Sequence, residues 1–555
     1  MATDTNEPAD RASTAQDARP LGLTLLSGAI AAAMVFPLSW LLVRAAEVDA
    51  ARAFGIVFRA RNFEITLNSL VLMGSVTVLS VLIAVPLAVL TVRTDLPHRR
   101  FWTVVVALPL ALPSYIGAFA FVSVFRPRGV VQSWLEPFGV QELPSIYGLP
   151  GAIVIITLYT YPYVYITTRA ALKGFDGSLV DAALTLEQSR WAAFRRVTLP
   201  QIQPAIAAGA LLVALYAVSD FGTPAFLQAE VFTRQIYLEH RSLGGAHYAA
   251  FLSLQLVAIT LLILSVESRI RGNEPLYTDS ASSGTGSRIR LGRWKWPATM
   301  ACGLLGFVTL VLPVLIYTHW LFTVQTTRAE TFAFSPIHAL NSVGVSAAAA
   351  VVAAALALPV AYLAARHPNR LSWTFERATY VGFAVPGIVI GLALVFFGAN
   401  YGTFSIGGYS LGDTTLRTVE LSVYQSIPIL VFAYVVRFMP QAVGATRTSV
   451  LQVNPKLTEA AATLGKEPVA AFRSVTLPLI APGVVAGAAL VFLTTMKELP
   501  ATLLLRPTGF ETLVTRIWAA ESAAVYGQAA IPALILIVVS GCSMVIILKQ
   551  ENYDG

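Results

Sequence analysis

The sequence predicts an all-α polytopic membrane protein with twelve transmembrane helices, arranged as two tandem six-helix units of the same orientation. First, the 555-residue chain is 56% hydrophobic and only 12% charged, whereas a soluble domain carries about 25% charged residues. Second, twelve apolar runs approach or exceed the roughly 20 residues that a membrane-spanning helix needs. Third, long segments of the first half recur in the second half, which indicates a duplicated unit.

The expected spans run from residue 21 to residue 547. We place them at 21–43, 65–92, 101–125, 148–168, 203–227, 247–266, 297–323, 338–363, 379–398, 420–443, 479–499 and 527–547. An even number of spans puts both termini on one side. Because Lys and Arg are more frequent in the loops on that side, both termini are expected to be cytoplasmic.

The same reading divides the chain into five parts. They are a cytoplasmic tail (1–20), a first six-span unit (21–266), a polar cytoplasmic linker (267–295), a second six-span unit (296–549) and a short tail (550–555). The linker contains TDSASSGTGS, whose Gly and Ser content is typical of a flexible connection.

Composition also argues against several classes of site. The net charge of +8 is better explained by basic cytoplasmic loops than by binding of nucleic acid. Cys302 and Cys542 lie in apolar runs, and the six histidines are scattered, so neither a disulfide framework nor a metal site is expected.

The repeat is clearest in a polar loop after the fourth span of each unit. Residues 181–206 (DAALTLEQSRWAAFRRVTLPQIQPAI) and 459–484 (EAAATLGKEPVAAFRSVTLPLIAPGV) agree at 14 of 26 positions. A second repeat, at a slightly different offset, relates the second span of each unit. There Asn68, Ser69, Pro86 and Arg93 recur as Asn341, Ser342, Pro359 and Arg366.

Each copy of the polar loop is expected to form two short helices with a break. Asn454 followed by Pro455 is a good start for a helix. Gly465 is suited to end that helix in a left-handed conformation. Glu187 stands at the equivalent position of the first copy, where a residue other than glycine is strained.

This loop resembles the EAA loop of binding-protein-dependent ATP-binding-cassette (ABC) importer permeases. The second copy matches that pattern through Glu459, Ala460, Ala461 and Gly465, and the first through Asp181, Ala182 and Ala183. The resemblance implies that both loops carry a coupling helix, which docks on a separate ATP-hydrolysing subunit.

Partners and cofactors follow from the same resemblance. It implies an ATPase subunit, in two copies, an extracytoplasmic solute-binding protein, and a location in the bacterial inner membrane. The chain contains no Gly-x-x-x-x-Gly-Lys-Ser/Thr phosphate loop. We therefore expect a transport subunit that is not an enzyme and binds no cofactor, with ATP used by the partner.

A narrower resemblance concerns the solute. The segments MKELPATLLLRPTGFETLVTRIW and AYVVRFMPQAVGATRTSVLQVNPKLTEAA are similar to those of fused ferric-iron permeases, so ferric iron is the expected solute. Permeases for thiamine, aminoethylphosphonate and polyamine remain alternatives. A secondary transporter with twelve spans is an alternative of a different class, but the duplicated polar loops have no role in it.

Three charged residues lie in or beside the expected spans. Asp220 and Glu498 occupy equivalent positions at the outer ends of the fifth and eleventh spans, and Arg437 lies within the tenth. Charged groups at such depth usually face a cavity or a partner, so these three are candidates for the translocation path. Pairing of Glu498 with Lys497, or solvation at the interface, stays open for the carboxylates. Four alternating tyrosines (159, 161, 163 and 165) are better explained by an interfacial aromatic belt than by metal binding.

Overall fold

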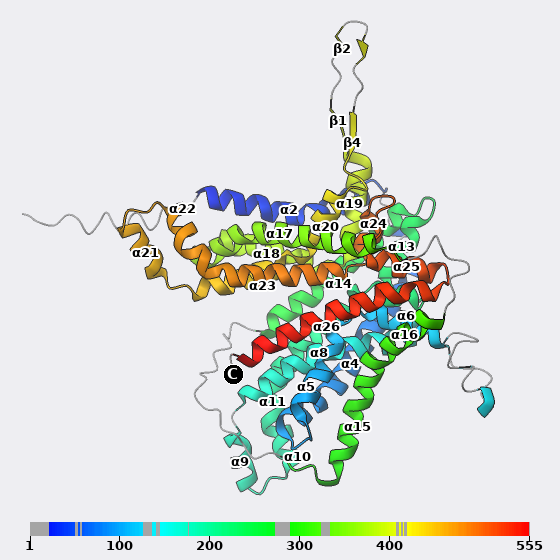
Figure 1. Ribbon diagram of the computed structural model, residues 1–555, viewed down its shortest axis with the longest axis vertical. Coiled ribbons are helices and arrows are strands. Elements are labelled where there is room, and N and C mark those ends of the chain that lie inside the picture. Colours follow the sequence, from blue (N-terminus) through cyan, green and yellow to red (C-terminus); the bar gives the residue numbers. More distant parts are fainter. Residues whose placement is uncertain are drawn as a thin grey trace, which may run out of the picture. The chain divides into compact units, whose positions relative to one another are not determined.

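The computed structural model describes residues 21–49, 51, 54–55, 58–125, 132, 136–139, 145–175, 177–271, 289–323, 334–406, 410–411, 414–415 and 419–553. Almost all regular structure in these residues is helical (Figure 1). The expected N-terminal tail (1–20) and most of the expected linker (272–288) lie outside them.

Nine helices in the described residues are long and apolar enough to cross a membrane. They comprise α2 (Leu21–Ala46), α4 (Ala60–Arg93), α8 (Leu149–Gly174), α11 (Leu199–Ser219) with its preceding turns, α14 (Ala246–Arg271), α15 (Lys295–Gly306) continuing into α16 (Leu312–Thr323), α17 (Pro336–Arg366), α20 (Ile427–Gln452) and α23 (Leu477–Met496). Each coincides with one of the expected spans, and α20 begins seven residues later than predicted, at residue 427 instead of 420.

Two further expected spans are sharply bent helix pairs. In the first unit α5 (Arg99–Ala107) with its 3-10 extension meets α6 (Ser114–Phe125) at 88°. In the second unit α18 (Arg370–Ala384) meets α19 (Gly387–Tyr401) at 101°. Each break contains a proline, Pro113 or Pro386, and these are separated by 273 residues, as Arg93 and Arg366 are. Proline interrupts a helix because it has no backbone N–H to donate. The last expected span corresponds to α26 (Ala530–Tyr553).

Short helices follow the fifth span of each six-span unit. They are α12 (Gly222–Phe226), α13 (Phe232–Arg241), α24 (Pro500–Leu505) and α25 (Leu513–Ser522). The expected spans 203–227 and 479–499 therefore end early, at Ser219 and Met496, where the chain turns into α12 and α24.

Between α19 and α20 the chain forms strands, which the sequence analysis did not predict. The strands β1 (Thr403–Ile406) and β4 (Val419–Ser422) pair antiparallel, with Thr403 opposite Ser422. The two-residue strands β2 (Ser410–Leu411) and β3 (Thr414–Thr415) pair in the same way.

The described chain divides into two compact units, and each combines segments from both sequence repeats. Of the described residues, those within 21–40, 344–383 and 427–495 form one unit, and those within 41–343, 384–426 and 496–553 form the other. In the larger unit α4, α8 and α11 pack against one another, and α16 packs against α6. The Tyr317 hydroxyl on α16 donates to the carbonyl of Ile116, 2.7 Å away.

The repeated Asn and Ser of the second span make the same hydrogen bonds in both copies. Asn68 donates to the carbonyl of Glu230, and the Ser69 hydroxyl accepts the backbone N–H that starts α13. Asn341 donates to the carbonyl of Glu511, and the Ser342 hydroxyl accepts the backbone N–H that starts α25. The repeated Asn and Ser therefore attach α13 to α4 in the first half and α25 to α17 in the second half in the same way.

Three of the four tyrosines of α8, Tyr159, Tyr161 and Tyr165, are buried inside the helix packing, so the expectation of an interfacial belt was wrong for these three. Tyr163 is partly exposed. Tyr161 donates to the carbonyl of Val106 at 2.7 Å, and Tyr159 to the carbonyl of Thr309 at 3.1 Å. Both rings are at most 2% exposed. Their hydroxyls therefore satisfy backbone acceptors between helices rather than meeting lipid headgroups.

The end of the expected linker is fixed to the loop that follows α4. Ile289 forms a parallel β-bridge with Thr94. The Asp95 carboxylate accepts the Leu291 N–H at 2.9 Å and pairs with Lys295, also at 2.9 Å. The pKa of Asp95 is lowered, mainly by the hydrogen bond from Leu291 and further by Lys295.

Candidate functional site

The duplicated polar loop has the same architecture in both copies. The first repeated loop (178–198) contains α9 (Ser178–Thr185), α10 (Arg190–Ala193) and a π-helical turn that leads into α11. The second repeated loop (455–476) contains α21 (Pro455–Thr463), α22 (Pro468–Ala471) and a π-helical turn that leads into α23. The predicted pair of short helices with a break is confirmed in each copy.

The two first helices start differently. Asn454 caps α21, as predicted, with its side chain accepting the Lys456 N–H at 3.0 Å. Helix α9 starts after Gly177 without a side-chain cap. Asp181 consequently lies in the first turn of α9, whereas Glu459 is the fifth residue of α21. The helix dipole favours a carboxylate within the first turn, so this contribution belongs to Asp181 more than to Glu459.

Both first helices end in the same left-handed motif. The N–H of Gln188 bonds to the carbonyl of Ala183 at 3.2 Å, and the N–H of Lys466 bonds to that of Ala461 at 3.1 Å. The residues in the left-handed position are Glu187, with φ of 59°, and Gly465, with φ of 77°. The glycine is therefore in the predicted conformation, and Glu187 adopts it at a steric cost that glycine avoids.

The alanines of the repeated motif have two different roles. Ala183 and Ala461 are buried under the helix end, at 8% and 6% exposure. Ala182 and Ala460 are exposed beside the acidic residues Asp181 and Glu459, which are exposed too. One alanine of each pair supports the turn, and the other leaves room for close approach of another surface.

Each loop also exposes apolar side chains that the sequence analysis missed. Leu186 and Leu464 occupy equivalent positions at the ends of α9 and α21 and are 76% and 83% exposed. Trp191 and Val469 are a second equivalent pair and are also exposed. Their recurrence at matching positions of the repeat was the signal available in the sequence. Because these exposed apolar groups recur at matching positions, the two loops are candidates for contact with another protein.

A side-chain contact braces the break in each loop. In the first loop Arg196 donates to the Gln188 amide oxygen at 3.1 Å. At the equivalent positions of the second loop Lys466 donates to the Ser474 hydroxyl at 2.8 Å. The donor stands at the later position in the first loop and at the earlier position in the second, but the same two positions are connected. In each loop this contact ties the segment after the break to the end of the first helix.

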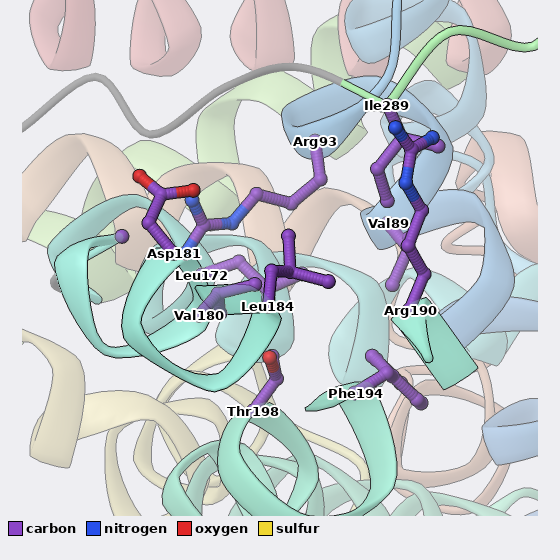
Figure 2. Close-up of a pocket in the computed structure, with 11 residues that line it drawn as sticks. Val89, Arg93, Leu172, Val180, Asp181, Leu184, Arg190, Phe194, Thr198 and Ile289 are labelled. Carbon is purple, nitrogen blue, oxygen red and sulfur yellow. The ribbon is translucent and has the colours of Figure 1, made fainter. Parts of the chain in front are cut away.

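A small pocket lies under the first repeated loop (Figure 2). Its lining comes from α4, α8, the loop itself and the end of the linker, and consists of Val89, Arg93, Leu172, Gly177, Val180, Asp181, Leu184, Arg190, Phe194, Thr198 and Ile289. In the second copy Tyr362 stands where the repeat places Val89, and its ring meets that of Phe472 edge to face at 5.2 Å. Because valine is much smaller than tyrosine, the first loop has an open space where the second has a ring contact.

Asp220 and Glu498 lie just before the short helices α12 and α24, and each carboxylate accepts a hydrogen bond. The Asp220 carboxylate accepts the Ser114 hydroxyl at 2.9 Å and lies just before α12, which starts at Gly222. The Glu498 carboxylate, 5% exposed, accepts the Ala501 N–H in the first turn of α24 at 3.3 Å. Both equivalent carboxylates therefore lie just before equivalent short helices, one residue ahead of the N-cap residues Phe221 and Leu499.

The bend before α6 brings further polar groups to these carboxylates. Tyr115 lies within electrostatic reach of both Asp220 and Glu498. Its hydroxyl donates to the carbonyl of Lys497 at 3.4 Å, and the Lys497 ammonium donates to the carbonyl of Ala111 at 2.8 Å. Sequence reasoning did not find Ser114, Tyr115 or this contact of Lys497, because they depend on the sharp bend at Pro113.

Arg437 lies in the other compact unit, half-buried on α20. Its guanidinium stands over the ring of Phe438, 5.5 Å from the ring centroid. Its predicted place in the translocation path remains a prediction. Among the described residues, no three His, Cys, Asp or Glu side chains gather in a group suited to hold a metal ion.

Comparison with known proteins accounts for both the repeat and the loops. The family model of the binding-protein-dependent transport system inner membrane component matches twice, at residues 78–271 and 357–550. The chain is 32% identical to the Fe(3+)-transport system permease protein FbpB 2 of Haemophilus influenzae, over 96% of this chain and 98% of the relative.

More distant relatives are named for the transport of other solutes. The chain is 26% identical to the sulfate transport system permease protein CysT of Escherichia coli, over 45% of this chain and 90% of the relative. It is 30% identical to a probable molybdenum ABC transporter permease protein of Haloferax volcanii, over 36% of this chain and 72% of the relative. With two matches of the family model and similarity to a transport permease over 96% of the chain, the chain belongs to the binding-protein-dependent transport system inner membrane components, the multi-pass permeases of ABC transporters.

Proposed function

We propose that this chain forms the transmembrane path of an importer and couples solute movement to ATP hydrolysis on separate subunits through its two repeated loops. The observation that carries the proposal is the matched surface of the loops. In both copies an exposed carboxylate, an exposed alanine and an exposed leucine surround a helix end of the same geometry. Two equal docking surfaces fit two copies of one ATPase subunit.

The polarity of these surfaces supports contact with a partner rather than simple solvation. An exposed leucine beside a small residue offers apolar contact area, while Asp181 or Glu459 supplies a charge for a basic group. The proposal places both loops and both termini in the cytoplasm. An extracytoplasmic solute-binding protein then delivers solute to the opposite face.

Ferric iron is the solute we propose, on the strength of the 32% identity to a fused permease whose name includes Fe(3+) transport. Carboxylate and phenol oxygens near the bend, from Asp220, Glu498 and Tyr115, are of the kind that a hard cation prefers. Sulfate and molybdate, which the other relatives name, are the second candidates, and Lys497 beside these groups is the observation that favours an anion.

Reconstitution tests this function. The chain, the ATPase subunit and the solute-binding protein encoded with it are assembled in proteoliposomes, and ATP-dependent uptake of ferric iron, sulfate and molybdate is compared. Uptake of iron alone supports the proposal. Uptake of an oxyanion alone contradicts the proposal of ferric iron as the solute but agrees with ATP-driven transport. Uptake without ATP or without the ATPase subunit contradicts the proposed coupling to ATP hydrolysis.

A further inference from the structure

Arg93 and Arg366, the repeated arginines of the second spans, have no role in the function proposed above. Arg93 is the last residue of α4, and Arg366 is the last residue of α17. A cation in the last turn is favourable to the helix dipole, but that role needs no particular partner. The partners of the two side chains are, however, equivalent to each other.

In the first copy the Arg93 guanidinium lies over the ring of Phe175, with Cζ 4.8 Å from the ring centroid. Phe175 is 8% exposed and joins α8 to the first repeated loop. The same guanidinium points toward the Asp181 carboxylate (Figure 2), and the two charges interact. Arg93 thus contacts the chain just before α9 and attracts the acidic residue on α9.

In the second copy the Arg366 guanidinium donates to the carbonyl of Val453 at 2.7 Å. Val453 is 7% exposed and joins α20 to the second repeated loop, at the position that the repeat equates with Phe175. The chemistry differs, a cation–π contact in one copy and a hydrogen bond in the other. The connection is the same, from the end of the second span to the residue that precedes the docking helix.

The two copies of this connection are hard to explain by local stability alone. The arginines recur at one offset and their partners at another, so two separate parts of the duplicated sequence have kept the same contact. Apolar packing connects the second loop to α17 as well. Val450, Val453 and Ile480 form a cluster with Tyr362 of α17 and Phe472 of the loop. The second span is therefore the element on which each repeated loop rests.

We propose that Arg93 and Arg366 are positioning residues that transmit movement of each repeated loop to the second span of its half. This proposal rests on the function proposed above. When a docked loop moves with the ATPase, a charged contact and a buried aromatic or backbone partner carry the displacement to α4 or α17. Without the arginine, the loop still folds and docks but moves independently of the span.

The test uses the full complex with Arg93→Gln and Arg366→Gln, singly and together. Three quantities are measured: the ATPase subunit retained on the purified chain, the rate of ATP hydrolysis, and the solute taken up per ATP hydrolysed. We expect retained subunit and continued hydrolysis, with uptake per ATP in the double variant falling roughly tenfold, within the usual range of a coupling free energy.

Matched variants separate positioning from general effects of charge. Arg100→Gln and Arg370→Gln remove exposed arginines that follow the same two spans and should leave uptake per ATP unchanged. Arg93→Lys and Arg366→Lys keep a cation and a donor and should restore most of it. Loss of uptake per ATP in the two control variants would contradict the proposal.

Two other outcomes overturn it. If the glutamine variants transport normally per ATP, the arginines position nothing. If they only lower the amount of folded complex, while the remaining complex keeps normal uptake per ATP, their role is stability. Failure of the unmodified chain to retain any ATPase subunit would instead refute the function proposed above, so the two failures are distinguishable.

Discussion

Exchanging the residues at the left-handed position of the repeated loops is the sharpest test of their local geometry. Gly465 and Glu187 share this position, with φ of 77° and 59°. A Cβ placed on Gly465 would meet no heavy atom within 4 Å. The effect of a side chain there is therefore one of backbone conformation and charge, not of steric conflict with neighbours.

The magnitude follows from two opposing contributions. A residue other than glycine in the left-handed region costs about 1–2 kcal/mol. Replacing glycine also lowers the entropy of the unfolded chain, which returns about 0.4–1 kcal/mol. The net cost of Gly465→Glu is about 1 kcal/mol, which corresponds to a roughly fivefold weaker association of the ATPase subunit if the turn must form for docking. Glu187→Gly should leave association unchanged or strengthen it.

The assay is titration of the ATPase subunit onto the purified chain in detergent or nanodiscs. Gly465→Ala is the matched control, because it has the same backbone cost without the added charge, and it should weaken association about as much as Gly465→Glu. The reasoning is refuted if Glu187→Gly is the more damaging change. In that case the Glu187 carboxylate has a partner contact of its own.

Two other predictions concern the isolated chain. The purified chain alone should hydrolyse no ATP, because it contains no phosphate loop, and hydrolysis that persists after partner subunits are excluded contradicts this. Asp95→Ala should accelerate hydrogen exchange at the Leu291 amide, which bonds to the Asp95 carboxylate. The pKa of Asp95 is lower in the folded chain than its ordinary value of about 3.9. In the unmodified chain the Leu291 amide should therefore be protected from exchange above that ordinary value and lose the protection as the pH falls through the folded pKa of Asp95. Loss of protection already at pH 6 would argue against the contact.

Much of the fold was predictable because membrane spans and duplications leave strong patterns in a sequence. The repeated Asn, Ser and Arg of the second span were visible as identities, but their partners, such as Glu230 and Phe175, were not. Those partners lie more than 80 residues away in the chain, and no local pattern connects them. The sequence also could not show that each compact unit combines segments of both repeats, since that depends on packing between distant helices.

The candidate site shows the same division. Gly465 and the break after α21 followed from local rules for helix ends, and they are confirmed. The positions of Asp220 and Glu498 just before the short helices α12 and α24 did not follow, because the ends of α11 and α23 were placed several residues too late.

The exposed leucines were missed for a different reason. In a chain that is 56% hydrophobic, a single leucine in a loop does not distinguish an exposed side chain from a buried one. Only the structure distinguishes Leu186 and Leu464, which are exposed, from the buried alanines three residues before them.

The central claim is that the acidic residues of both repeated loops couple ATP hydrolysis to transport. The most direct measurement is ATP-driven uptake in proteoliposomes by the double variant Asp181→Ala, Glu459→Ala, together with co-purification of the ATPase subunit. Exposed ion pairs and helix-dipole contributions are each about 1 kcal/mol or less, so the membrane fold and docking of the solute-binding protein should stay intact. We expect weakened association of the ATPase subunit and no uptake, and full uptake by the double variant would show that these carboxylates do not couple hydrolysis to transport.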